Sequence, residues 1–169
     1  SYFDFFFNQA FSYDKRNQRY RTTDGYVSRF NQNIPIISDT YTLTNTYDYK
    51  IYNKWVDENV ASLGIYLKSA NSISGKNVKL SDRLYIPSKK LRGFEAGKVG
   101  PKDGADYIGG NYATTINIAS TLPQILPSLE NTNFSIFLDA ANIWGIDYSS
   151  SLAEDSQIRS SVGVAVDFL

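Results

Sequence analysis

The chain offers little of the side-chain chemistry on which most enzymes depend. Its 169 residues include neither Cys nor His, which excludes disulfide bonds, thiol nucleophiles, Cys/His zinc sites and imidazole acid–base catalysis. The carboxylates show no spacing typical of a general acid and base, and Ser and Lys are merely abundant. We therefore expect a protein that is not an enzyme and that uses neither a metal nor a cofactor.

The most distinctive segment is a long connection from about residue 74 to residue 110, which we expect to be the functional centre or a surface flap. Six of the eleven glycines lie between Gly93 and Gly110. This spacing predicts sharp turns or a backbone that approaches another part of the molecule closely. A phosphate-binding loop is excluded because no helix start follows and the Walker spacing is absent. The basic residues that open the segment are Lys89, Lys90 and Arg92.

Alternation of apolar and polar residues is the main signal in the rest of the chain. Leu43, Tyr47 and Tyr49, for example, alternate with Thr and Asp side chains, as in a β-strand with two different faces. The pattern predicts seven antiparallel strands and no helix. The seven strands are expected at about residues 3–13, 26–37, 40–53, 59–73, 111–122, 134–140 and 162–168.

The composition of the two faces favours a β-barrel in a membrane over a soluble β-domain. The polar face is rich in Ser, Thr, Asn and Gly, which suits the lumen of a barrel whose apolar face meets lipid. Trp55, in the turn after the third strand, and Trp144, at the end of the sixth, fit aromatic belts at the bilayer interface. A soluble domain with core aromatics remains open. The 17 basic and 17 acidic residues balance, so nothing points to nucleic acid.

The face assignment also predicts an ion pair between the long connection and a strand. Asp139 shares the polar face with Ser135 and Phe137, so it is expected to point into the lumen, where a carboxylate needs a partner. Arg92 supplies one if the connection folds inward, because a guanidinium matches a carboxylate bidentately. Gly93 then allows a tight backbone, and Phe94 fills an apolar gap against the wall. The alternative is that Arg92 and Asp139 are separate solvated charges.

Four blocks of sequence, from about residue 12 to the end, carry a resemblance to the BamA family. The first lies near the start and comprises Asp14-Lys15-Arg16-Asn17, Tyr20, Thr23 and Gly25. The second is Leu91-Arg92-Gly93-Phe94, Gly97, Val99-Gly100-Pro101 and Gly109-Gly110-Asn111-Tyr112. The third runs from Phe137 to Gly145 and is similar to the family's F-x-D-x-G-N-x-W block, and the fourth is Ile158 to Ala165. In this order and at these spacings they resemble the turn, the long sixth extracellular loop and the following strands of that family.

The resemblance implies a role without bond chemistry. BamA-like proteins fold and insert β-barrel proteins in the outer membrane of Gram-negative bacteria, with unfolded outer-membrane proteins as clients, accessory assembly lipoproteins as partners and the lipid bilayer as surroundings. The resemblance also implies that Arg92 of the loop pairs with Asp139 of the strand. In many relatives a Glu on the intervening strand also takes part in this ion pair. The expected register places Ala119 at that position in this chain. Ala141 and Thr22 stand where the family has Gly and Pro.

The family comparison also implies a partial barrel, in which residues 1–169 form about seven strands of a probable sixteen. We expect a piece of a longer protein, because periplasmic POTRA domains and two closing strands would be absent from this chain. Two rivals stay open. One is a TamA-like factor or a two-partner secretion transporter of the same superfamily, and the other is a passive diffusion porin whose loop constricts the pore.

Overall fold

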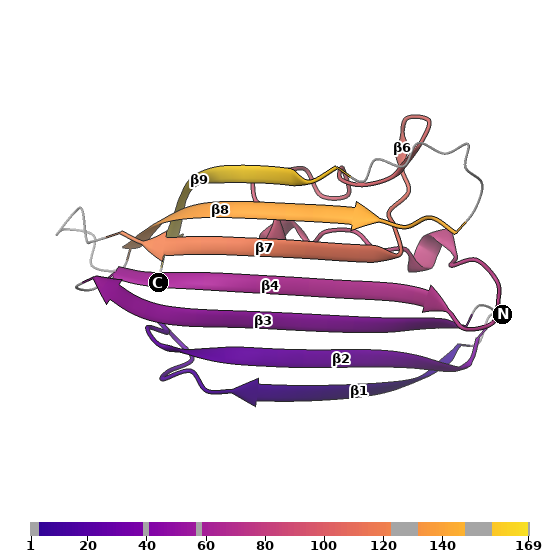
Figure 1. The fold of residues 1–169 in the computed structure, drawn as a ribbon, viewed down its shortest axis with the longest axis horizontal. Coiled ribbons are helices and arrows are strands. Elements are labelled where there is room, and N and C mark those ends of the chain that lie inside the picture. The colour runs from indigo at the N-terminus through magenta and orange to yellow at the C-terminus, as the bar shows by residue number, and fades with distance from the viewer. Residues whose placement is uncertain (1–3, 39–40, 57–58, 123–131, 148–156, 169) are drawn as a thin grey trace.

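The computed structural model describes residues 4–38, 41–56, 59–122, 132–147 and 157–168. Seven long strands lie side by side in one antiparallel sheet of order β1-β2-β3-β4-β7-β8-β9 (Figure 1). Their bounds are β1 Phe5–Asp14, β2 Gly25–Ile37, β3 Thr42–Val56, β4 Asn59–Ser72, β7 Tyr112–Thr121, β8 Thr132–Trp144 and β9 Arg159–Phe168. The all-β, seven-stranded architecture expected from the alternation is thus confirmed.

The connection between β4 and β7 is the one long excursion from the sheet among the described residues. It contains two short 3₁₀ helices, η1 (Leu80–Asp82) and η2 (Ser88–Lys90), and a small hairpin of β5 (Lys102–Asp103) and β6 (Asp106–Tyr107). The connection leaves the strands at the right-hand end of Figure 1 and passes behind β7 and β8. No helix in the described part of the chain is long and apolar enough to span a membrane.

The sheet has two chemically different faces, as its alternation requires. We call the face against which the connection packs the inner face and the opposite one the outer face. On β8, the inner Ser135, Asp139 and Ile143 are buried, whereas Ile136 and Leu138 on the outer face are each 47% exposed. The apolar face is therefore the solvent- or lipid-facing one, and the polar face carries the loop.

The core lies between the loop and the inner face of the sheet. Leu91 and Ile143 are almost fully buried there, one from the loop and one from β8. The whole cluster comprises Ala70, Val78, Leu84, Ile86, Leu91, Val99, Ala113, Ala141 and Ile143. The wall contributes mainly Ala and the loop contributes the larger side chains, so the loop fits onto the sheet as a compact layer.

β8 extends from Thr132 to Trp144 instead of about residues 134–140, and two further strand boundaries differ from those expected. The third strand continues to Val56, and β4 begins at Asn59, so Trp55 belongs to β3 and not to the turn after it. The last strand begins at Arg159 instead of Val162. In both places polar residues such as Lys54 and Ser160 extend the pairing, because ladder hydrogen bonds do not depend on an apolar side chain.

Candidate functional site: a loop fastened to the inner wall

Asp139 lies in the middle of the site, with a side chain that is fully buried on the inner face of β8. Burying a carboxylate is costly unless donors surround it. Here three groups supply donors: the backbone and the side chain of Arg92, and the side chain of Asn117. The buried Asp is therefore a meeting point of the loop and two strands.

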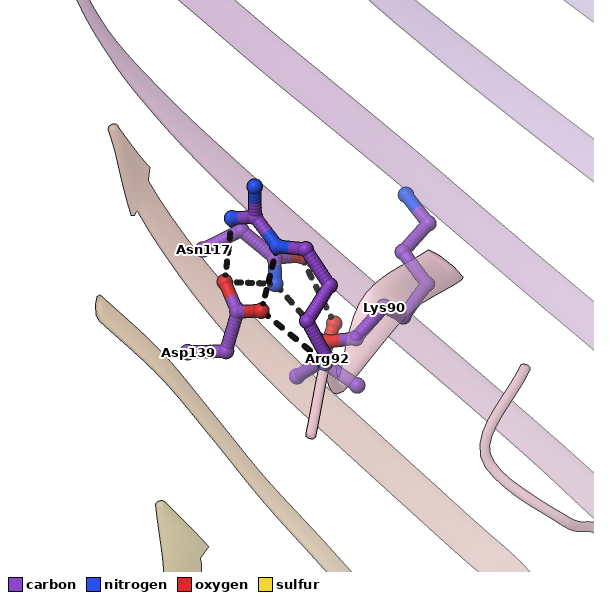
Figure 2. A network of polar contacts seen from close by, with 5 residues as sticks. Lys90, Arg92, Asn117 and Asp139 are labelled. Atoms are coloured by element: carbon purple, nitrogen blue, oxygen red, sulfur yellow. Dashed lines mark hydrogen bonds and ion pairs between the residues drawn. The ribbon is translucent and has the colours of Figure 1, made fainter. Parts of the chain in front are cut away.

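Arg92 reaches Asp139 with the bidentate geometry expected from the sequence (Figure 2). Its Nε donates to Oδ2 at 2.8 Å and its Nη2 donates to Oδ1 at 2.8 Å. The backbone N–H of Arg92 adds a third bond to Oδ2 at 3.1 Å. Two parallel charge-assisted bonds fix the guanidinium plane as well as its distance. We call the Arg92–Asp139 pair the latch.

Asn117, on β7, takes the place that the expected register gave to Ala119. Asn117 is paired directly with Asp139, and Ala119 is paired with Phe137, so that expectation was wrong by two residues. A shift of two residues keeps the same face, which is why the alternation did not reveal it. The Asn117 Nδ2 donates to Asp139 Oδ1 at 2.9 Å and to the backbone carbonyl of Lys90 at 2.7 Å.

The aromatic ring of Phe137 packs against the guanidinium group of Arg92. The Arg92 Cζ lies 3.6 Å from the centroid of the ring, close enough for a cation–π interaction. Gly163, which pairs with Phe137 on β9, leaves the space for this ring, because a Cβ there would lie 2.8 Å from Phe137 Cζ. The alternation predicted Phe137 on the inner face but gave it no role. A large aromatic residue among small polar side chains is a signal that could have indicated a contact with the loop.

A second fastening, which the sequence did not predict, joins Lys90 to β3. The Lys90 Nζ lies 2.7 Å from Asp48 Oδ2 and 5.1 Å from the centroid of the Tyr66 ring on β4. The sequence did contain a signal for this ion pair. Lys90 and Arg92 are cations on either side of Leu91, which is buried. The loop is thus tied to β3 and β8, with Asn117 of β7 between them.

Phe94 lies against the apolar cluster of the core, as expected for a residue that fills a gap at the wall. It is half-buried and packs on the cluster that contains Leu91 and Val99. The polar latch and this apolar packing therefore sit close together along the loop.

The glycines of the loop make its close contact with the sheet possible. Gly100 has φ +107° and a Cβ there would lie 2.8 Å from Cβ of Ile143. A Cβ at Gly110 would lie 2.6 Å from the carbonyl oxygen of Trp144. Positive φ values also occur at Gly93, Gly97 and Gly109. The expectation of sharp turns and close backbone approach is met at these positions.

The two Trp residues lie at opposite ends of the sheet, Trp144 on the outer face and Trp55 at the irregular pairing between Lys54 and Val56. Trp55 is 65% exposed near the end of β3, and Trp144 is 36% exposed at the end of β8. β3 and β8 run in opposite directions in the antiparallel order (Figure 1). Trp144 also stacks on Tyr112, with ring centroids 5.7 Å apart. Two aromatic positions at the two ends fit the two interfaces of a bilayer.

The contacts described above hold the loop in place on the sheet. Among the residues that the structure describes, no three His, Cys, Asp or Glu side chains gather closely enough to hold a metal ion. What the site can do is hold a long loop against the inner wall through charge, hydrogen bonds and packing.

These features are typical of a section of a β-barrel wall with a long loop folded against its inner face. The Omp85 superfamily domain matches the chain over residues 1–169. A crystal structure of BamA from Haemophilus ducreyi, lacking POTRA domains 1–3, superposes with a TM-score of 0.84 and 23% identity over 98% of this chain. The chain belongs to the Omp85 superfamily, whose barrels lie in outer membranes.

A second relative is a SAM50-like protein of Schizosaccharomyces pombe, which is 36% identical over 67 residues, or 38% of this chain. The chain spans 36% of the BamA structure and 14% of the SAM50-like protein, so it corresponds to a part of each. Since these relatives come from a bacterium and a yeast, the Gram-negative source expected from the resemblance stays a prediction.

Proposed function

We propose that this chain is the loop-bearing part of an outer-membrane assembly factor that folds β-barrel proteins and inserts them into the membrane. The latch carries the proposal, because a fully buried Asp139 held by Arg92 fastens the long loop to the inner face. A wall fixed in this way is a stable base from which another part of the barrel can open and template client strands by edge pairing.

The proposed activity needs no bond-making chemistry, so we propose that the protein is not an enzyme. Its clients are unfolded outer-membrane proteins, and its surroundings are the lipid bilayer and accessory assembly lipoproteins. Membership of the Omp85 superfamily and the likeness to BamA support this assignment. A TamA-like factor or a two-partner secretion transporter would differ in the number of its periplasmic domains and in whether its client crosses the membrane or is inserted into it.

The test is client insertion by the full-length protein reconstituted in liposomes. Arg92→Ala and Asp139→Ala are expected to slow the insertion of a client barrel about tenfold or more, which corresponds to ~1.4 kcal/mol or more in activation free energy. Lys76→Ala is the control, because Lys76 is an exposed loop residue away from the latch. A wild-type protein that inserts no client, or that carries the client across the membrane, contradicts the proposal.

Ion conductance separates the assembly factor from a diffusion porin. We expect the wild-type protein to give small and irregular currents in planar bilayers, because the docked loop occupies the inner face. Arg92→Ala is expected to raise the mean conductance as the loop detaches. Large, steady channels in the wild-type protein, unchanged in Arg92→Ala, would instead identify a porin in which the loop merely narrows the pore.

A further inference from the structure

A cavity of about 530 Å³ lies on the inner face, between the loop and the turn that joins β1 to β2. Its lining comes from three parts of the chain that are distant in sequence. These are the turn between β1 and β2, the inner face of the strands, and the loop residues Lys89, Lys90 and Arg92. The cationic side chains among the described lining residues are Arg19, Arg21, Lys50, Lys89, Lys90 and Arg92. Asp167 is the carboxylate that the described lining contains.

Much of this positive charge is not neutralised within the described chain. Lys90 and Arg92 have carboxylate partners in Asp48 and Asp139. Arg21 and Lys89 line the same cavity without an ion pair to any residue that the structure describes. Cations that converge on a partly enclosed space repel one another and raise the local concentration of anions. The cavity therefore has the electrostatics of an anion site.

The turn that presents Arg21 is built rigidly. The Asn17 side chain accepts hydrogen bonds from the backbone N–H groups of Gln18, Thr23 and Asp24 at 3.0–3.3 Å. Its Nδ2 donates to Thr23 Oγ1 at 2.7 Å. Arg21 itself adopts φ 49°, a left-handed conformation that costs a non-Gly residue energy and persists where the surroundings enforce it. The strained position of Arg21 is thus fixed in advance of any ligand.

Neutral donors complete the cavity. Hydroxyl and amide groups of the wall that lie among the cations include Ser62, Asn133 and Ser135. The donors of Thr22, Asn117 and Thr121 are already used within the chain. A phosphate group has oxygen atoms in several directions and accepts bonds from many such donors at once, whereas a carboxylate is planar and has two oxygens. The volume exceeds what one phosphate needs and falls in the range of ligand pockets.

We propose that this cavity binds an anion with two or more phosphate groups, held by Arg21 from the turn and by Lys89 from the loop. The site shares Lys90 and Arg92 with the fastening of the loop, but the proposal does not rest on client insertion. Its phosphate groups can belong to a soluble di- or polyphosphate or to a lipid headgroup, and the test distinguishes these two sources.

The experiment measures tripolyphosphate binding by isothermal titration calorimetry on the full-length protein in phosphatidylcholine nanodiscs at constant ionic strength. Arg21→Gly is the informative variant, because Gly accepts a positive φ without strain and so removes the cation while keeping the turn. We expect a tenfold or greater loss of affinity in Arg21→Gly and in Lys89→Gln, with no loss of thermal stability in Arg21→Gly. Arg16→Gln is the matched control, since Arg16 belongs to the same turn but pairs with Asp14 outside the cavity.

Three outcomes overturn the proposal: no tripolyphosphate binding, equal loss in Arg16→Gln, or equal affinity for hexaglutamate, which identifies a carboxylate site. The source follows from repeating the titration in nanodiscs that contain cardiolipin, whose headgroup carries two phosphate groups. If the lipid headgroup is the ligand, it competes and lowers the apparent affinity of the wild-type protein tenfold. An unchanged affinity identifies a soluble anion.

Discussion

At the scale of single residues, the site is governed by the cost of burying Asp139. The carboxylate is fully buried, whereas 32% of the Arg92 side chain remains exposed. Loss of the guanidinium leaves a buried negative charge with the Asn117 amide and one backbone N–H as donors. The two partners are therefore unequal, and truncating Arg92 should be the more harmful change.

Arg92→Ala is expected to destabilise the folded barrel by about 2–3 kcal/mol, somewhat below the ~3–5 kcal/mol of a fully buried pair because Arg92 is partly exposed. Arg92→Lys should lose less, because it keeps the charge without the planar fork. The measurement is the half-life of the folded form, followed by its heat-modifiable migration on gels at fixed temperature. Lys76→Ala serves as the control. Equal half-lives in all variants would contradict a structural role for the latch.

Gly163→Ala should weaken the latch without touching Arg92 or Asp139. The added Cβ would lie 2.8 Å from Cζ of Phe137 and would push the ring away from the guanidinium, at a cost of about 1–3 kcal/mol for overpacking. The same substitution in a Phe137→Leu background should cost clearly less, because a smaller side chain can move aside. The half-life assay measures both, and an equal cost in the two backgrounds would show that Phe137 is not the cause.

Part of the site could be predicted from residue types. Arg92 and Asp139 were expected to pair because a lumenal carboxylate needs a cation and the loop offered one. Lys90 with Asp48, and Asn117 with Asp139, were missed, because their contacts depend on register and on the course of the loop. Alternation fixes which face a side chain occupies, but two residues of shift leave that face unchanged.

At the scale of elements, the loop functions as a packed layer and not as a flexible flap. Its large apolar side chains meet small residues of the wall, such as Ala70, Ala113 and Ala141. Ala141 is 2% exposed and belongs to this core. The strands were predictable from alternation, whereas the small hairpin of β5 and β6 was not, since two-residue strands carry no periodic signal.

The two loop glycines Gly100 and Gly104 allow a matched test of this packing. Gly104 has φ +60° and open space within 4 Å of where a Cβ would lie, whereas a Cβ at Gly100 would overlap Ile143. Gly104→Ala should cost about 1 kcal/mol from backbone strain alone. Gly100→Ala should cost about 1–3 kcal/mol more, because the loop must shift away from the sheet. Equal half-lives of the two folded variants would contradict close docking of the loop.

At the scale of the whole molecule, the described sheet ends in two edge strands, β1 and β9, each of which has a neighbour in this sheet on one side only. Open edges are not tolerated in lipid, so the seven strands complete a barrel only together with further strands. The latch lies on β8, next to one of these edges, and Lys90 extends the fastening to β3. The loop thereby ties together strands that are three positions apart in the sheet.

A mutant cycle of the latch in the client-insertion assay tests the central claim most directly. The full-length protein is compared with Arg92→Ala, Asp139→Ala and the double variant. If both residues act through one contact, each single change slows insertion about tenfold or more, and the double variant is no slower than the slower single variant. Normal insertion in both single variants, or losses that simply multiply in the double variant, would contradict the latch as the support for assembly.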